Sequence, residues 1–247
     1  MFGMLAQRIV GVITLLLVAS ASAGDGVHLA LSGLHNAADP VRGGGDWWGI
    51  FPEGEGYTFQ PVRVRVEAII DPLADGDTRK TATEITVPGK AEDVPLVRGL
   101  MSAVAGPLNS LKPPKDWGYI APGDSITLPW DGAQSKHALT ISAEGREVLK
   151  EAPGSKWTEV VNYKLRLNRK SGKATISQVL VSIPEPKDQD GPELLWAGDL
   201  DRDGKLDLLY DLRSFYTRHE LALFLSSAAQ DGELVGLVVR WNARGGC

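Results

Sequence analysis

The sequence predicts an all-β fold of antiparallel strands in a sandwich-like arrangement. Apolar and charged residues alternate through residues 62–68, which places the valines in a core and the charges in water. Proline-glycine turn signals such as Pro88-Gly89, Pro122-Gly123 and Pro153-Gly154 separate such runs at short intervals. Short strands divided by turns favour a sandwich or barrel over alternating strands and helices.

The first 23 residues are interpreted as a signal peptide. Arg8 precedes an apolar run over 9–19, and Ala21-Ser22-Ala23 gives the small-residue site that signal peptidase accepts. The run is shorter than the roughly 20 residues that span a bilayer, although an uncleaved membrane anchor is the alternative. Gly24 stands where a lipoprotein would need cysteine. We expect a mature chain that begins at Gly24, has no transmembrane segment and is periplasmic or extracellular.

The remaining strands follow in chain order. Alternation recurs over 139–143 and 161–167, and residues 168–173 then turn the chain into a β-branched run over 174–183, which predicts a hairpin. No long amphipathic helix is expected, and the best helical candidate is residues 96–105, a short stretch that contains Gly99.

A polar, proline-rich segment over 185–192 is predicted to be a linker. It divides the mature chain into an antiparallel β domain over 24–184 and a smaller β module over 193–247.

The smaller module contains a run of alternating aspartates with the spacing of a calcium loop. They occupy positions 1, 3, 5 and 9 of residues 199–207: Asp199, Asp201, Asp203 and Asp207. Alternate carboxylates can turn inward around a hard cation, while Gly204 permits a sharp bend and the carbonyl of Lys205 adds an oxygen. Crowded carboxylates repel one another unless a cation or protons neutralise them. The predicted cofactor is therefore Ca²⁺, and an acidic surface turn without metal is the alternative.

The loop is not an EF-hand, because Tyr210 stands where that motif needs an acidic ligand. Apolar runs over 194–196 and 208–210 flank it and are typical of strands. The arrangement resembles the strand-loop-strand calcium motif of FG-GAP and VCBS repeats. The resemblance covers about residues 196–210 and implies calcium binding. A full β-propeller is not expected, because propellers repeat such units blade after blade and this chain has one copy.

Further strands are expected over 219–225 and 233–239, packed on the loop. Calcium would then hold the last sheet together, which is a structural role.

Charge and cysteine content limit the classes of partner. The net charge is −5, which argues against nucleic acid and anionic lipid. Cys247 is the only cysteine, so no internal disulfide can form. A non-enzymatic protein is favoured, because the usual serine-hydrolase and zinc-protease motifs are missing and His28, His35 and His137 are scattered. A secreted hydrolase acting on cell-envelope polymer is the rival hypothesis.

A protein or glycan ligand at the cell envelope is the partner that the sequence favours. Trp47 and Trp48 lie in a glycine-rich segment, and exposed tryptophans stack on sugars or anchor partner proteins. The alternative is that one or both fill the core, as expected of Trp117, Trp130, Trp157 and Trp241.

Overall fold

The computed structural model describes residues 26–70, 80–112, 118–130, 139–171, 174–186, 191–213 and 218–245. Within these residues the protein is all-β, with one 3-10 turn, η1 (Ser226–Ala228), as the sole helical element. The strands are β1 (His28–Leu31), β2 (Gly33–Ala38), β3 (Gly44–Glu53), β4 (Gly56–Ile69), β5 (Ala82–Thr86), β6 (Pro95–Arg98), β7 (Gly106–Ser110), β8 (Ser125–Leu128), β9 (Leu139–Ala152), β10 (Ser155–Ser171), β11 (Ala174–Ile183), β12 (Glu193–Asp199), β13 (Asp207–Asp211), β14 (Arg218–Leu225) and β15 (Gly236–Gly245).

The larger sheet is barrel-like. Its 11 strands run in the order β1-β6-β3-β4-β5-β2-β15-β14-β13-β12-β7, and β7 also pairs with β4. That extra pairing closes a ring from β4 through β5, β2, β15, β14, β13 and β12 to β7. All the pairings are antiparallel, and the arrangement is not a propeller.

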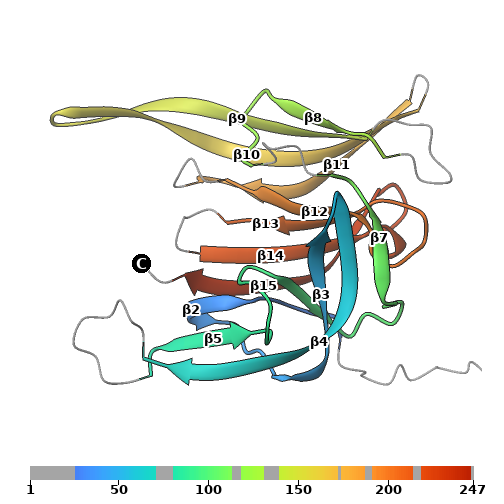
Figure 1. Ribbon diagram of the computed structural model, residues 1–247. Coiled ribbons are helices and arrows are strands. Elements are labelled where there is room, and N and C mark those ends of the chain that lie inside the picture. Colours follow the sequence, from blue (N-terminus) through green and yellow to red (C-terminus); the bar gives the residue numbers. More distant parts are fainter. Residues whose placement is uncertain are drawn as a thin grey trace, which may run out of the picture.

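The smaller sheet has four strands in the order β11-β10-β9-β8 and lies against one side of the larger one (Figure 1). The predicted hairpin is confirmed: β10 pairs with β11 from Tyr163↔Ile183 to Ser171↔Ala174, so residues 168–171, expected in the turn, belong to the strand. This packing of sheet on sheet is the sandwich-like part of the fold.

Two hydrophobic cores result, and β13 contributes to both. Leu209 packs inside the barrel, whereas Leu208 and Tyr210 pack between the two sheets. Every residue of β13 is buried. Burial on both faces explains why residues 208–210 are continuously apolar instead of alternating.

The predicted division of the chain does not divide the sheet. β12 pairs with β7, and β15 pairs with β2, so strands that follow the expected linker complete the same sheet as strands that precede it. Part of that linker, residues 187–190, lies outside the described residues, as do residues 1–23 of the expected signal peptide.

The helix expected over 96–105 is wrong. Pro95–Arg98 forms β6 between β1 and β3, where Leu96 and Val97 are both fully buried. A short strand with both faces covered has a continuous apolar sequence that resembles a helical segment. In the part of the chain that the structure describes, no helix has the length and apolar character needed to cross a membrane.

Candidate metal centre

The aspartate run forms the connection between β12 and β13. Asp199 ends β12 and Asp207 begins β13, in the register Gly198↔Asp207. The flanking side chains of Leu200 and Leu206 are 1% and 3% exposed, and they insert into the barrel core and the inter-sheet core respectively. The two ends of the loop are therefore fixed by packing, as the predicted strand-loop-strand arrangement requires.

The bend in the loop depends on backbone conformation. Gly204 has φ of 82°, in the left-handed region that glycine adopts without strain. A Cβ built on Gly204 would meet no atom within 4 Å, so the constraint is conformational and not steric. Arg202 has φ of 63° in the same loop.

Three of the four predicted aspartates converge. Asp199, Asp201 and Asp207 each offer a carboxylate oxygen, and these oxygens lie within 4.8 Å of one another. Charges at such distances repel strongly where water is partly excluded. The triad could hold a metal ion.

The fourth aspartate, Asp203, is not part of this triad and forms hydrogen bonds instead. Asp203 Oδ2 accepts a hydrogen bond from Ser226 Oγ at 2.8 Å, and its Oδ1 accepts one from the Lys205 N–H at 2.8 Å. Lys205 Nζ lies 3.4 Å from Asp203 Oδ2. Asp203 thus braces the loop against η1, beside the triad.

Burial makes the charged form of Asp207 costly. The side chain is fully buried, and this raises its pKa to about 7. The negative charge of Asp201 acts in the same direction, whereas N–H groups of Ser226, Leu200 and Asp201 oppose the rise. Nothing cationic is among these partners.

Asp199 has one carboxylate oxygen without a hydrogen-bond partner among the described residues. Its Oδ2 accepts a hydrogen bond from the Gly204 N–H at 3.0 Å, while Oδ1 is buried and has no partner among the described residues. Burial raises the pKa of Asp199, and the charges of Asp203 and Asp201 add to the effect. A buried carboxylate oxygen without a donor is costly unless a cation lies against it.

Two serines that the sequence pattern did not indicate complete the site. Ser226 N–H donates to Asp207 Oδ1 at 2.8 Å, and Ser227 Oγ donates to Asp201 Oδ2. Both follow β14, which confirms that a strand in this region packs beside the loop. The two serines could have been found by pairing the expected strands around the loop, because the register Leu208↔Phe224 brings the end of β14 next to the start of β13.

A second polar cluster lies at the opposite ends of the same strands. Asp211, at the end of β13, is fully buried, and its Oδ2 lies 2.7 Å from both His219 Nδ1 and Arg213 Nη2. Arg213 also pairs with Glu193 at 3.3 Å. Burial raises the pKa of Asp211, but the His219 hydrogen bond, the Arg213 charge and the Glu220 N–H outweigh it, so this pKa lies below its usual value.

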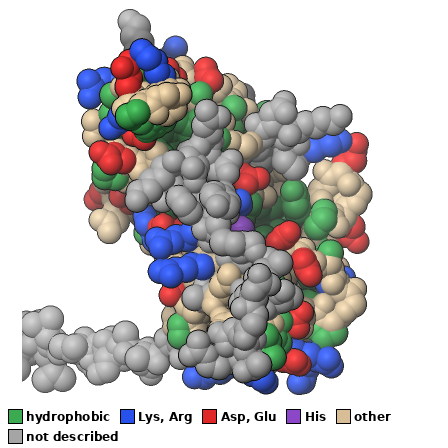
Figure 2. Space-filling model, turned by 90° about the vertical axis from the view of Figure 1, so that its left-hand side faces the viewer, with side chains coloured by type: hydrophobic (Ala, Val, Ile, Leu, Met, Phe, Trp, Pro, Cys, Tyr) green, Lys and Arg blue, Asp and Glu red, His purple; other side chains and the backbone are tan. Residues whose placement is uncertain are grey.

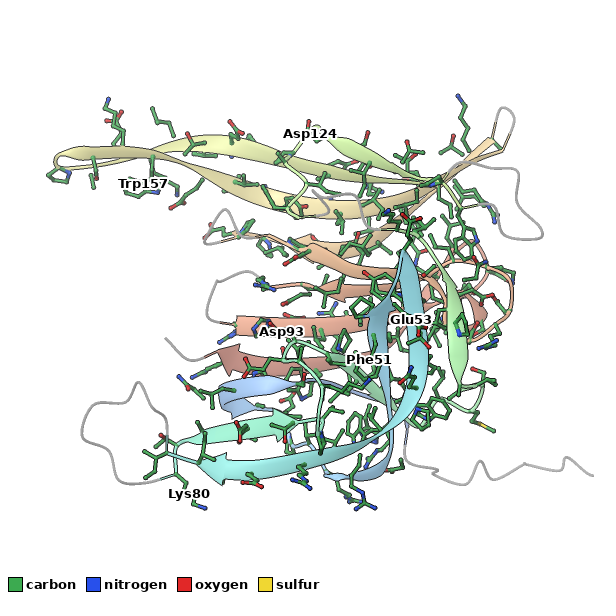
Figure 3. All side chains as sticks on the ribbon, viewed as in Figure 1. Phe51, Glu53, Lys80, Asp93, Asp124 and Trp157 are labelled. Atoms are coloured by element: carbon green, nitrogen blue, oxygen red, sulfur yellow. The ribbon has the colours of Figure 1, made fainter. Side chains whose placement is uncertain are left out.

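This cluster forms one side of a hollow of about 740 Å³, named here the His219 pocket. The rest of its lining combines apolar side chains, such as Leu31, Ile50 and Val94, with the charged residues Lys90 and Glu92. Figure 3 labels two further lining residues, Phe51 of β3 and Asp93 of the segment before β6. On the face shown in Figure 2, a histidine side chain lies near the centre, with acidic, basic and hydrophobic side chains around it.

The tryptophan pair is not an exposed pair. Trp47 is 1% exposed, and its Nε1 donates to the Arg42 carbonyl at 2.8 Å. Trp48 is half-buried and packs on Phe59 with ring centroids 5.1 Å apart. The core alternative therefore holds for Trp47.

The other tryptophans differ in burial. Trp130 and Trp241 are buried as expected. The prediction that Trp157 is buried is wrong, because this side chain is 43% exposed near the free end of the β9–β10 hairpin (Figure 3). Trp117 lies outside the described residues, as do His137 and Cys247. One of the scattered histidines, His35, does lie beside another histidine, since the ring centroids of His35 and His219 are 6.1 Å apart.

Comparison with known proteins finds no matching protein-family model, no matching curated protein and no matching solved structure.

Proposed function

We propose that this is an exported, non-enzymatic β protein in which the loop of residues 199–207 binds a structural calcium ion. The observation that carries the proposal is the contrast between the two aspartates of β13. Asp207 and Asp211 are both fully buried on one strand, yet among the described residues Asp211 has two basic partners and Asp207 has none. A buried charge needs a counter-charge, and a cation bound by the triad would supply it.

The chemistry of the donors favours calcium over other ions. The available ligands are carboxylate oxygens, which suit hard cations, and the triad contains neither the histidine nor the cysteine that zinc or copper prefers. Magnesium requires a tight octahedron and retains several waters, whereas calcium accepts irregular oxygen cages. Asp199, Asp201 and Asp207 would hold the ion, and Asp203 and the Lys205 carbonyl are the remaining predicted donors.

The role proposed for the ion is to join three elements. β12 contributes Asp199, β13 contributes Asp207, and η1 binds Asp207, Asp203 and Asp201 through its two serines. A cation between the carboxylates would replace repulsion with attraction at the point where these elements meet.

Calcium titration of Asp201→Asn by isothermal calorimetry tests the proposal. Asp201 is half-buried, so the substitution should leave the fold intact while removing one charged ligand. We expect wild type to bind one calcium ion with Kd of order 0.1 to 1 mM, and the variant to bind about tenfold more weakly. Asp124→Asn is the matched control, because Asp124 is an exposed aspartate in the turn before β8 (Figure 3). Equal calcium binding by Asp201→Asn and Asp124→Asn would refute the assignment.

Export and the envelope partner belong to the same proposal and rest on the sequence. Mass spectrometry of protein recovered outside the cytoplasm should give Gly24 as the first residue. An intact Met1 would overturn the signal-peptide interpretation.

The His219 pocket gives a specific reason to retain the rival hypothesis, a secreted hydrolase acting on cell-envelope polymer. With Nδ1 directed to Asp211, a neutral His219 presents Nε2 as an acceptor for a proton from water. Hydrolysis of purified envelope polymer by wild type, and its loss in His219→Ala, would establish the enzyme. Equal release of fragments by wild type and His219→Ala would exclude this pocket as the active site.

A further inference from the structure

A third hollow, away from both clusters, collects positive charge in an acidic protein. Its volume is about 510 Å³, and it lies between β1, β6 and β15 beside Trp47. Three arginines and a histidine line it, against a single acidic side chain, Asp39: the basic residues are His28, Arg42, Arg98 and Arg240. The whole chain has a net charge of −5, so this concentration of arginines is local.

Arg98 is the unusual member. It is 7% exposed, and the structure describes one carboxylate beside it, Asp46, whose Oδ2 lies 3.7 Å from Nη1. That distance is longer than a hydrogen bond, and Asp46 is itself 64% exposed. A guanidinium has five N–H donors, and no nitrogen of Arg98 is among the fully buried polar atoms without a partner, so these donors remain accessible from the hollow. The acceptors that the described residues do not provide could come from a ligand in the hollow.

The guanidinium is also held in position. It lies over the Trp47 ring, with Cζ 5.3 Å from the centroid, which is a cation–π contact. Trp47 is fixed by its own hydrogen bond to the Arg42 carbonyl. A charged group fixed in this way loses little side-chain entropy when it binds an anion.

The remaining polar groups of the hollow are consistent with an anion. The one acid, Asp39, accepts hydrogen bonds at Oδ2 from both the backbone N–H and the Nδ2 of Asn242, at 2.9 and 3.2 Å. His28 Nε2 is buried and has no partner among the described residues. Arg42 is exposed at the rim, whereas Arg240 is paired with Glu220 at 2.6 Å. The donors left for a ligand are those of Arg98, Arg42 and His28.

We propose that this hollow binds a compact anionic group, a phosphate or carboxylate, through Arg98 with help from Arg42 and His28. Arginine matches the geometry of both groups with two parallel hydrogen bonds. The proposal does not depend on calcium, because none of the lining residues belongs to the 199–207 loop.

Calorimetric titration of the full chain with phenyl phosphate tests the site, with benzyl alcohol as the uncharged probe. Wild type should bind phenyl phosphate and not benzyl alcohol, and added salt should weaken the binding. Arg98→Gln should lower the affinity by about tenfold or more, because it removes a charge-assisted hydrogen bond. Arg65→Gln is the matched control, since Arg65 is an exposed arginine of β4 that does not line the hollow, and it should change nothing.

Arg42→Glu tests the site independently in case Arg98→Gln does not fold. Arg42 is exposed, so reversal of its charge should not unfold the chain. It should weaken phenyl phosphate binding several-fold. Vesicles of phosphatidylglycerol, compared with phosphatidylcholine, distinguish a lipid phosphate from a free one. Binding to phosphatidylglycerol vesicles that is lost in Arg98→Gln would indicate a lipid phosphate, whereas binding of phenyl phosphate without vesicle binding would indicate a free one. Absence of phenyl phosphate binding by wild type, or equal affinity in Arg98→Gln and Arg65→Gln, would overturn the proposed site.

Discussion

The stability of the metal-free protein should depend on pH through Asp207, in a direction opposite to that of most aspartates. Burial raises the pKa of Asp207 from 3.8 to about 7. Each tenfold change in an acidity constant corresponds to about 1.4 kcal/mol, so the charged form in the folded protein is disfavoured by about 4 kcal/mol. The folded state then binds more protons than the unfolded state between these two pKa values. Stability from this group is intact at low pH and is lost as the pH rises from about 4 to about 7.

Urea unfolding in the presence of a chelator, followed across that window for wild type and Asp207→Asn, measures the effect. Other groups titrate in the same range: burial lowers the pKa of His35, which makes stability rise with pH and partly hides the Asp207 contribution. The difference between wild type and variant removes His35 from the comparison. Asn cannot ionise, so the free energy of unfolding of wild type relative to Asp207→Asn should fall by about 4 kcal/mol from pH 4 to above pH 7.

Calcium should cancel this loss in wild type, because an adjacent cation favours the charged carboxylate. It should do little for Asp207→Asn. Asp211→Asn is the matched control on the same strand: its pKa is lowered by its basic partners, so the variant should be less stable above the pKa of an unfolded aspartate, with or without calcium. A difference between wild type and Asp207→Asn that stays constant from pH 4 to pH 7 would refute the reasoning.

Three further predictions concern the loop and the core. Gly204→Ala should destabilise by about 1 to 2 kcal/mol and weaken calcium binding, because φ of 82° is strained for alanine. Gly54→Ala, at φ of 60° in the turn between β3 and β4, should lose stability in urea but keep its calcium affinity, because Gly54 is outside the 199–207 loop. Ser226→Ala removes a side-chain hydrogen bond to the loop and should cost about 1 kcal/mol by urea unfolding; an unchanged midpoint would mean that this bond contributes nothing. Trp196→Ala should lower the free energy of unfolding by about 3 to 5 kcal/mol, because its side chain is 1% exposed. Trp157→Ala should change the free energy of unfolding by no more than about 0.5 kcal/mol, because its side chain is 43% exposed. Equal losses of stability would contradict the burial described for the two tryptophans.

The fold class could be predicted from period-two alternation over residues 62–68, 139–143 and 161–167, which lie in β4, β9 and β10, whereas β1, β2, β3, β5, β7 and β8 were not predicted. The prediction of a helix over 96–105 failed where both faces of β6 are covered and Leu96 and Val97 follow one another in the core. Local sequence also could not reveal that β12 pairs with β7 and β15 with β2, since these pairings join residues far apart in the chain. The proline-rich segment at 185–192 therefore resembled a domain boundary although the sheet continues across it.

The candidate site was predictable to the extent that its ligands are close in sequence. Spacing alone identified Asp199, Asp201 and Asp207, because alternate residues of a tight loop converge. It could not distinguish the role of Asp203, whose hydrogen bond to Ser226 depends on how β14 ends beside the loop. The His219 pocket could not be predicted from sequence spacing either, because its lining comes from five or more separate segments of the chain.

The position of the loop determines how far the effect of a bound cation would extend. Leu200 anchors one end in the core inside the barrel, and Leu206 anchors the other in the core between the sheets. Repulsion among Asp199, Asp201 and Asp207 would push these anchors apart, and neutralisation by a cation would allow both to remain buried. Because β13 itself packs into both cores, movement of the loop cannot be confined to one of them. Loss of the calcium ion proposed for this loop is therefore expected to loosen the barrel and the inter-sheet contact together, although the candidate ligands occupy only nine consecutive residues, 199–207.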